Sequence, residues 1–131
     1  MPRQIVYTTL LVPGYDEALR FFTQVLRFEV REDTRLSATK RWVVVAPSAQ
    51  GGALLLAQPG NAEQAAMVGK QGAGRVWLFL HTDDLDGDIA HMQAHGVVFD
   101  GAPRNESYGR VIVFTDCWGN RWDLIEPRPA T

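Results

Sequence analysis

The 131-residue chain has little of what several protein classes require. Cys117 is its only cysteine, so no internal disulfide can form, and this favours a reducing compartment. No apolar run approaches the roughly 20 residues that a membrane-spanning helix needs. Residues 1–4 lead directly into an apolar segment instead of a targeting peptide. We therefore expect a soluble cytoplasmic protein with no membrane partner.

The sequence also lacks a large excess of charge of either sign. The sequence has 13 Lys and Arg against 15 Asp and Glu, a formal net charge of -2, and no basic run. Nucleic-acid binding depends on clustered cations that neutralise phosphates, so no nucleic-acid partner is expected. With 46% hydrophobic and 21% charged residues, the chain has enough apolar side chains for one ordinary core. We predict a single domain over residues 1–131.

The first half of the chain has the pattern of a strand, a helix and three more strands. The β-branched segment Ile5–Val12 predicts a strand, which Pro13 and Gly14 end. A helix is expected next, with Asp16 as its N-cap and an end near Arg27. The three strands predicted after it cover residues 28–32, 41–46 and 53–57.

The second half repeats this order. Residues 75–82 predict a strand, Asp83 and Asp84 are N-cap candidates for a second helix, and Gly96 ends that helix. Three strands are again expected, over residues 97–99, 110–115 and 121–126.

The two halves agree in spacing as well as in order. A nearly constant offset places Tyr7 on Trp77 and Gly51 on Gly119. Independent segments seldom agree in both respects, so the chain is predicted to contain two copies of a βαβββ module.

The most specific pattern is a turn near the C-terminus. Asp116-Cys117-Trp118-Gly119-Asn120 stands between the apolar run Val111–Phe114 and a strand that contains Asp123. Asp116 can accept hydrogen bonds from turn amides, and Gly119 tolerates a positive φ. An Asp-x-x-Gly-Asn turn, followed by a strand with an acidic residue four positions after the Gly, resembles the ending of the vicinal oxygen chelate superfamily. That superfamily comprises glyoxalase, bleomycin-resistance and extradiol-dioxygenase proteins.

This resemblance covers residues 5–127 and implies a fold. It implies an α+β protein in which two βαβββ modules form an open, eight-stranded, cup-like mixed sheet, with the helices outside and a ligand within. The modules then span residues 4–57 and 75–127, and a linker rich in Gly, Ala and Gln spans 58–74. Many relatives dimerise by pairing or swapping modules, so the resemblance also implies a homodimer.

Metalloenzymes of this superfamily take metal ligands from four strands, at positions that correspond here to Tyr7, Leu55, Trp77 and Asp123. Only the Asp123 carboxylate is a good ligand, because leucine cannot coordinate and an indole N–H only donates. A tyrosine would have to ionise from a pKa of about 10. We therefore expect neither a metal site nor another cofactor. A divalent metal held by other ligands is the alternative.

The side chains that share the predicted cup face suit a small molecule. Alternation along the strands places aromatic and polar groups on one side, and the charged loop at 103–110 borders them. Such walls favour a planar or amphipathic ligand, held by stacking and a few hydrogen bonds. The predicted ligand-binding residues are Tyr7, Thr9, Leu55, Trp77, Phe79, His81, Tyr108, Arg110, Arg121 and Asp123.

Structural interpretations of the same residues stay open. Tyr7 and Trp77 can fill the cup as a second core. Asp123 can form a salt bridge with Arg121 or with a basic residue on a neighbouring strand, and His81 can be a hydrogen-bonded structural histidine. The charges of the 103–110 loop can simply be solvated.

Two functional classes follow. The first is a glyoxalase/bleomycin-resistance-like protein that binds a small aromatic or amphipathic molecule without metal and without turnover. The second is a lyase or dioxygenase-type enzyme of the same superfamily with an altered site, in which Asp123 and His81 are the catalytic candidates. The first is favoured because Leu55 and Trp77 occupy two of the ligand positions. A site that a second subunit completes by swapping is a third alternative.

Overall fold

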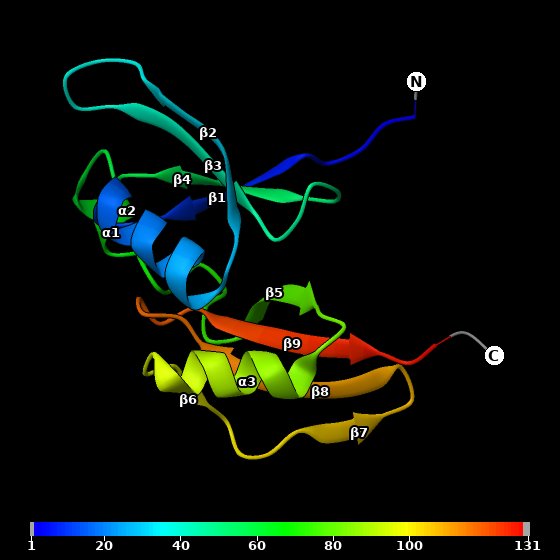
Figure 1. The fold of residues 1–131 in the computed structure, drawn as a ribbon. Coiled ribbons are helices and arrows are strands. Elements are labelled where there is room, and N and C mark those ends of the chain that lie inside the picture. Colours follow the sequence, from blue (N-terminus) through cyan, green and yellow to red (C-terminus); the bar gives the residue numbers. More distant parts are fainter. Residues whose placement is uncertain (1, 130–131) are drawn as a thin grey trace. The chain divides into compact units, whose positions relative to one another are not determined.

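The computed structural model describes residues 2–129, which form two compact units. The first unit extends to Val68 and the second begins at Gly69. Each has the element order strand, helix, then further strands, and each has one sheet (Figure 1). The predicted α+β class is thereby confirmed. The first unit has the predicted βαβββ order, and the second has the same order with one further strand. Within residues 2–129, no helix has both the length and the apolar character needed to cross a membrane.

The first unit is built on a four-stranded mixed sheet with the order β1-β4-β3-β2. β1 pairs in parallel with β4, and the other two pairs are antiparallel. The elements before residue 58 are β1 Tyr7–Leu11, α1 Tyr15–Arg20, a π-helical turn Phe21–Val25, β2 Glu29–Arg35, β3 Arg41–Ala46 and β4 Ala53–Ala57.

The helical segment of the first unit differs in detail from the prediction. Its N-cap is Gly14, in an extended conformation, so the assignment of the cap to Asp16 was wrong. Asp16 lies in the first turn, where its carboxylate accepts a hydrogen bond from Arg41 at 2.8 Å. The helix stops before Arg27, as expected, and Arg27 has a φ of 59°. The following strand continues to Arg35 because it stays paired with β3.

Arg41 joins three elements of this unit. Its guanidinium donates two hydrogen bonds to Asp33 of β2, at 3.1 and 2.7 Å, and lies over the Tyr15 ring of α1 at 5.2 Å. The hydrogen bonds to Asp33 and Asp16 raise the pKa of Arg41 above its ordinary value. Arg41 therefore marks the side of β3 that faces α1, and its neighbour Trp42 points to the opposite side.

The predicted linker is not without structure. A one-turn helix, α2, spans Ala62–Ala65, and the Asn61 side chain caps it by accepting the Gln64 backbone N–H at 2.8 Å.

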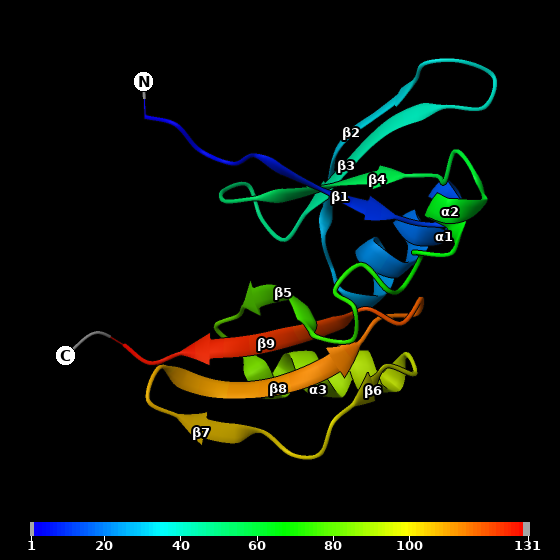
Figure 2. The same cartoon turned by 180° about the vertical axis from the view of Figure 1, so that it is seen from behind.

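The second unit has a sheet with the order β5-β9-β8-β6, and β7 pairs with β8 beside β6. α3 lies in front of β8 and β9 in Figure 1 and behind them in Figure 2, so it covers one face of the sheet. β7 is a strand that the sequence pattern did not predict, and it brings the described residues to nine strands instead of eight. The elements are β5 Val76–His81, α3 Leu85–Ala94, β6 Val98–Phe99, β7 Arg104–Glu106, β8 Gly109–Thr115 and β9 Arg121–Pro127.

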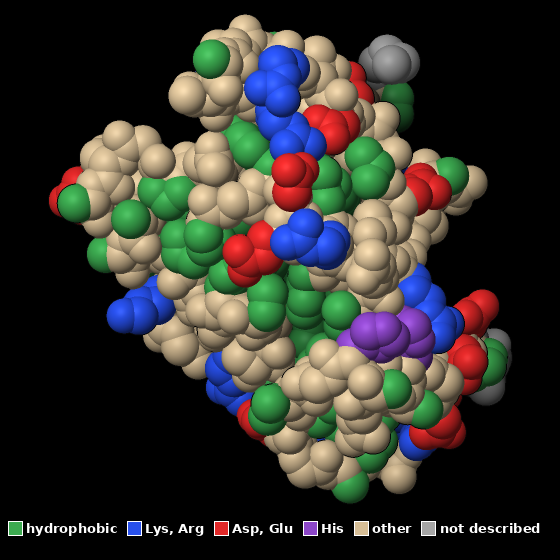
Figure 3. Space-filling view, turned by 60° about the vertical axis from the view of Figure 1, so that its left-hand side comes forward, with side chains coloured by type: hydrophobic (Ala, Val, Ile, Leu, Met, Phe, Trp, Pro, Cys, Tyr) green, Lys and Arg blue, Asp and Glu red, His purple; other side chains and the backbone are tan. Residues whose placement is uncertain are grey.

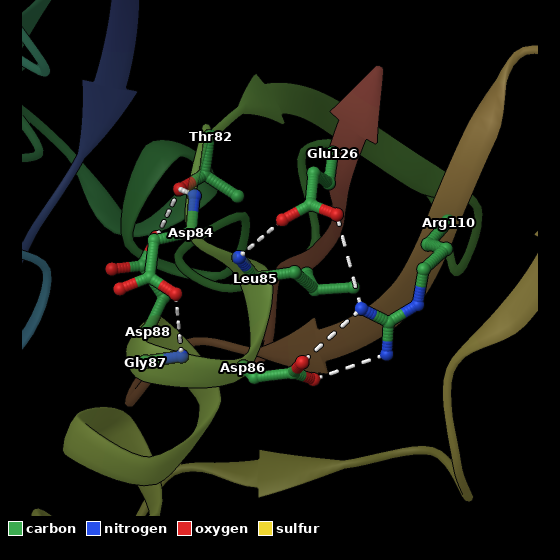
Figure 4. Close-up of polar contacts among 8 residues, drawn as sticks. All are labelled: Thr82, Asp84, Leu85, Asp86, Gly87, Asp88, Arg110 and Glu126. Atoms are coloured by element: carbon green, nitrogen blue, oxygen red, sulfur yellow. Dashed lines mark hydrogen bonds and ion pairs between the residues drawn. The ribbon is translucent and has the colours of Figure 1, made fainter. Parts of the chain in front are cut away.

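Side chains from three segments contact the start of α3 (Figure 4). Asp84 is the N-cap and accepts the Gly87 backbone N–H at 3.1 Å, which confirms one of the two predicted cap candidates. Glu126 of β9 accepts the Leu85 backbone N–H at 3.0 Å. Arg110 of β8 donates to Asp86 in the first turn at 3.0 and 3.3 Å. These contacts fix α3 to the face of the sheet that carries Arg110 and Glu126.

The Asp-x-x-Gly-Asn turn is organised by one buried carboxylate. Asp116 is 4% exposed, and its Oδ1 accepts the backbone N–H groups of Trp118, Gly119 and Asn120 at 3.1, 3.0 and 2.9 Å. Its Oδ2 accepts the Asn120 side-chain amide at 3.1 Å and the Trp122 indole N–H at 3.0 Å. A buried charge is tolerated when donors surround it in this way. Asp116 thus closes the turn and also fixes the start of β9.

Replacing Asp116 with alanine should destabilise the protein strongly, because it leaves several buried donors without an acceptor. We expect Asp116→Ala to lower the free energy of unfolding by about 3–5 kcal/mol, measured by urea denaturation. Asp84→Ala is the matched control, since it removes one exposed cap and should cost about 1 kcal/mol. Equal losses in the two variants would contradict this role for Asp116.

The second unit begins with a close backbone approach. Gly69 has a φ of +76°, and a Cβ placed on it would lie 1.8 Å from the Trp118 carbonyl oxygen. Gly74 has a similar φ of +87°, but a Cβ there would meet nothing within 4 Å. Both glycines have a positive φ that disfavours a side chain. Only at Gly69 would a side chain also clash with another segment of the backbone.

This pair gives a test of the approach between Gly69 and the turn. Gly74→Ala should lose about 1–2 kcal/mol, the usual cost of a left-handed alanine. Gly69→Ala should lose clearly more, because the backbone of Trp118 must also move. Thermal unfolding of both variants checks this, and a Gly69→Ala variant no less stable than Gly74→Ala would count against the packing described.

Candidate functional site

The face of the first sheet that points away from α1 carries an aromatic pair. The rings of Tyr7 and Trp42 meet edge to face, with centroids 6.1 Å apart and an interplanar angle of 74°. Tyr7 is 41% exposed, and Trp42 is partly buried. Edge-to-face pairs are a favoured arrangement of aromatic rings, and an exposed one presents both a ring face and a polar tip to a ligand.

Apolar side chains surround this pair. In the strand register Tyr7 lies beside Ala53, Thr9 beside Leu55, and Leu55 beside Val44, so all of them share one face. Val44 and Ala53 are buried, and Leu55 and Trp42 pack against them. The structure therefore brings Tyr7, Thr9 and Leu55 together, as alternation predicted. We call the set Tyr7, Thr9, Trp42, Val44, Ala53 and Leu55 the aromatic face.

The second sheet has an equivalent face, and it carries Asp123. Because Arg110 and Glu126 contact α3, alternation along β9 places Asp123 on the side away from the helix. Phe79 of β5 and Val113 of β8 lie on either side of Asp123 in register. Phe79 is 65% exposed and Val113 is buried. We call Phe79, Val113 and Asp123 the carboxylate face.

Asp123 is a buried carboxylate without a local partner. The residue is 9% exposed, and no hydrogen bond or ion pair joins its carboxylate to any residue from 2 to 129. Burial raises the pKa of Asp123, and the charges of Arg104 and Arg121 offset part of this rise. The salt bridge that sequence reasoning left open, between Asp123 and Arg121, does not form. Arg121 donates instead to Asp100 at 2.7 Å.

Trp77 and His81 lie on the same strand as Phe79. A bulge between Val76 and Leu78 places Trp77 out of register with β9. The alternation of side chains along β5 therefore does not tell which face Trp77 occupies. The Trp77 Cβ lies against Gly72, where an added Cβ would approach it to 2.7 Å. His81 is exposed and pairs in register with Ile125, on the same side as Phe79.

The other predicted residues are placed differently. Arg110 lies on the α3 side of the sheet and is engaged by Asp86 and Glu126, so it does not share a face with Asp123 (Figure 4). Tyr108 is 50% exposed and stands in the tight turn between β7 and β8. The structure thus separates Arg110 from the carboxylate face, whereas Tyr108 interacts with Arg104, whose charge acts on Asp123.

Neither face has a set of metal ligands. Within the part of the chain that the structure describes, no group of three or more His, Cys, Asp and Glu side chains is placed to hold a metal ion. On the surface drawn in Figure 3, the described basic and acidic side chains are interspersed and form no broad patch of one sign.

Trp42 is the aromatic side chain of the aromatic face that the sequence did not assign to the site. The sequence placed Arg41 and Trp42 on one strand without indicating which of them faced the helix. The available signal was Asp16, in the first turn of the predicted helix, whose carboxylate can pair with a cation on a strand facing that helix. The Arg41 contacts settle the direction of both side chains.

Comparison with known proteins identifies the family. The sequence model of the Glyoxalase/Bleomycin resistance protein/Dioxygenase superfamily matches residues 4–124. The chain belongs to this superfamily. An uncharacterized protein of Shewanella frigidimarina (strain NCIMB 400) is 44% identical over 128 residues, which are 96% of this chain and 95% of that protein. The uncharacterized protein YurT of Bacillus subtilis (strain 168) is 26% identical over 125 residues, or 94% of this chain and 98% of YurT.

Solved structures of superfamily members have the same fold. The crystal structure of TnmS3, an antibiotic binding protein from Streptomyces sp. CB03234, matches with a TM-score of 0.78 at 29% identity, covering 98% of this chain and 99% of TnmS3. A superfamily member from Sphaerobacter thermophilus DSM 20745 matches with a TM-score of 0.75 at 25% identity, covering 95% and 98%. UcmS2 matches with a TM-score of 0.79 at 24% identity, covering 96% and 99%, and this likeness supports the fold alone.

The raised pKa of Asp123 makes stability depend on pH in a definite direction. The folded protein holds this proton more tightly than the unfolded chain, whose carboxyl has the ordinary pKa of 3.8. The Asp123 contribution is therefore most favourable below pH 3.8 and is lost as pH rises through the raised value. Above the raised pKa of Asp123, the ionised carboxylate destabilises the fold.

Asp123→Asn should therefore raise the melting temperature at pH 7. The gain should shrink on acidification and vanish where wild-type Asp123 is fully protonated. Differential scanning calorimetry of both proteins from pH 3 to pH 8 measures this difference. A variant that is less stable than the wild type at pH 7 would show that Asp123 has a stabilising partner.

Proposed function

We propose that this superfamily member binds a small planar aromatic or amphipathic molecule and sequesters or carries it without chemical turnover. The single observation that carries the proposal is the aromatic face, where the Tyr7 and Trp42 rings stand over an apolar surface of the first sheet. Such a face offers stacking area at low entropic cost because both side chains are rigid.

The comparisons support this class of function. TnmS3 is named an antibiotic binding protein, and its likeness extends over nearly the full length of both chains. An aromatic antibiotic is therefore a reasonable class of ligand for this protein. The proposal includes a cytoplasmic homodimer that needs neither a metal nor another cofactor for binding.

The nature of the side chains also favours binding over catalysis. Of the positions that supply metal ligands in superfamily enzymes, Leu55 lies in the aromatic face as an apolar wall. The acid and base candidates Asp123 and His81 share a sheet face but make no hydrogen bond to each other. General acid and base catalysis needs groups held within hydrogen-bond reach of a reacting atom.

The experiment is a thermal-shift screen of the purified full chain against planar aromatic antibiotics. A ligand that binds only the folded protein at 100 times its Kd should stabilise it by about 2.7 kcal/mol. Saturable binding is expected, with the compound recovered unchanged by mass spectrometry. Recovery of a converted product would instead support the enzyme alternative.

Trp42→Ala should weaken binding of a compound found in this way. We expect Kd to rise about ten-fold or more, or about 1.4 kcal/mol, because the ring that stacks on the ligand is lost. Isothermal titration calorimetry gives the value. Leu36→Ala is the matched control, since Leu36 is 55% exposed at the β2–β3 hairpin and lies outside the aromatic face. Equal effects in the two variants would remove the aromatic face from the binding site.

A further inference from the structure

Asp123 is a buried charge that the fold itself does not use. Asp116, seven positions earlier, is similarly buried, yet its oxygens accept five hydrogen bonds from the turn and from Trp122. Asp123 accepts none from residues 2–129. The oxygens of Asp123 are not fully enclosed, so they keep contact with solvent. An unpaired buried carboxylate costs stability, and this points to a role outside the fold.

The surroundings of the carboxylate fit an aromatic ring. Phe79 lies directly beside Asp123 in the register of β5 and β9, and its side chain is the most exposed aromatic one in the second unit. Among residues 69–129, β5 is the edge strand of its sheet, next to β9. On the other flank the buried Val113 provides an apolar floor. A planar ligand can lie against Phe79 while one of its polar groups meets the carboxylate.

The charges around Asp123 restrict that polar group. Arg121 of β9 and Arg104 of β7 act on the Asp123 carboxylate through their positive charge. Each already has a partner, Asp100 for Arg121 and Glu106 for Arg104. An anionic group would meet the carboxylate itself, and a cationic group would lose its hydration beside a carboxylate of a residue that is only 9% exposed. A neutral hydrogen-bond donor avoids both penalties.

Two further titratable groups lie near this face: His81, two residues beyond Phe79 on β5, and Tyr108, which interacts with Arg104. Both are exposed, and Asp86 of α3 lies on the opposite side of the sheet. None of these groups changes the preference for a neutral donor.

We propose that the carboxylate face binds a neutral aromatic compound that bears a hydroxyl group, with the ring against Phe79 and the hydroxyl donating to Asp123. This rests on the proposed function and specifies the chemical class of the ligand.

A series of naphthalenes separates the possibilities, because its members share a ring and differ in one substituent. The probes are 2-naphthol, 2-methoxynaphthalene, 2-naphthoate and (2-naphthyl)methylammonium. At pH 7 these are a neutral donor, a neutral group with no donor, an anion and a cation. Each is titrated into the ¹⁵N-labelled full chain, and Kd is read from amide shifts.

We expect 2-naphthol to bind about ten-fold more tightly than 2-methoxynaphthalene, because a hydrogen bond to a charged acceptor is lost in the ether. The charged probes should bind more weakly than 2-naphthol. The amides of Phe79 and Asp123 should shift with 2-naphthol. Asp123→Asn should reduce the preference for the hydroxyl while the ether binds as before, and the same variant should be no less stable than the wild type.

Asp84→Asn is the matched control, since it makes the same change at an exposed cap that asparagine also fills. It should leave the preference intact. Equal binding of naphthol and ether overturns the present inference and leaves the proposed function standing. Tighter binding of either charged probe also overturns it. Failure of all four probes to bind overturns the inference and counts against the proposed function as well.

Discussion

The carboxylate of Asp116 is the interaction on which the second module depends. Its two oxygens accept hydrogen bonds from the turn backbone, from the Asn120 side chain and from Trp122. The same carboxylate therefore closes the turn and fixes the start of β9. Because β9 lies between β5 and β8, its register sets which residues face α3 and which face away. A one-residue slip would exchange Asp123 with Trp122. The position of the candidate site thus follows from a buried polar network some distance from it.

Two buried aspartates on the β8–β9 hairpin differ in what they do: one stabilises the fold and the other does not. Asp116 is satisfied by the fold, whereas Asp123 is buried with no partner from the described residues. A protein selected for stability alone would place an apolar residue at such a position. In superfamily metalloenzymes the corresponding residue binds a metal. Here the carboxylate stands beside the exposed ring of Phe79, in surroundings that suit an organic ligand.

The fold was predictable because several independent patterns agreed. Strand periodicity, the caps at Asp84 and Gly96, and the Asp-x-x-Gly-Asn turn each specified part of the βαβββ repeat. The site was predictable in part. The predicted face contained Thr9 with Leu55 and Phe79 with Asp123. Each pair lies in register on neighbouring strands, so the side chains of each pair do share a face. Alternation does not settle the direction of Trp77, because a bulge interrupts the count there. The position of Arg110 on the α3 side follows from its contact with Asp86, which depends on tertiary packing.

We propose that an aromatic molecule binds to the sheet faces that point away from the helices. Intermolecular nuclear Overhauser effects between bound 2-naphthol and the protein test this directly. We expect contacts to ring protons of Trp42 or Phe79, the reporters of the two faces. Contacts confined to the helix-facing sides, such as Tyr15 of α1 or Met92 of α3, would contradict it.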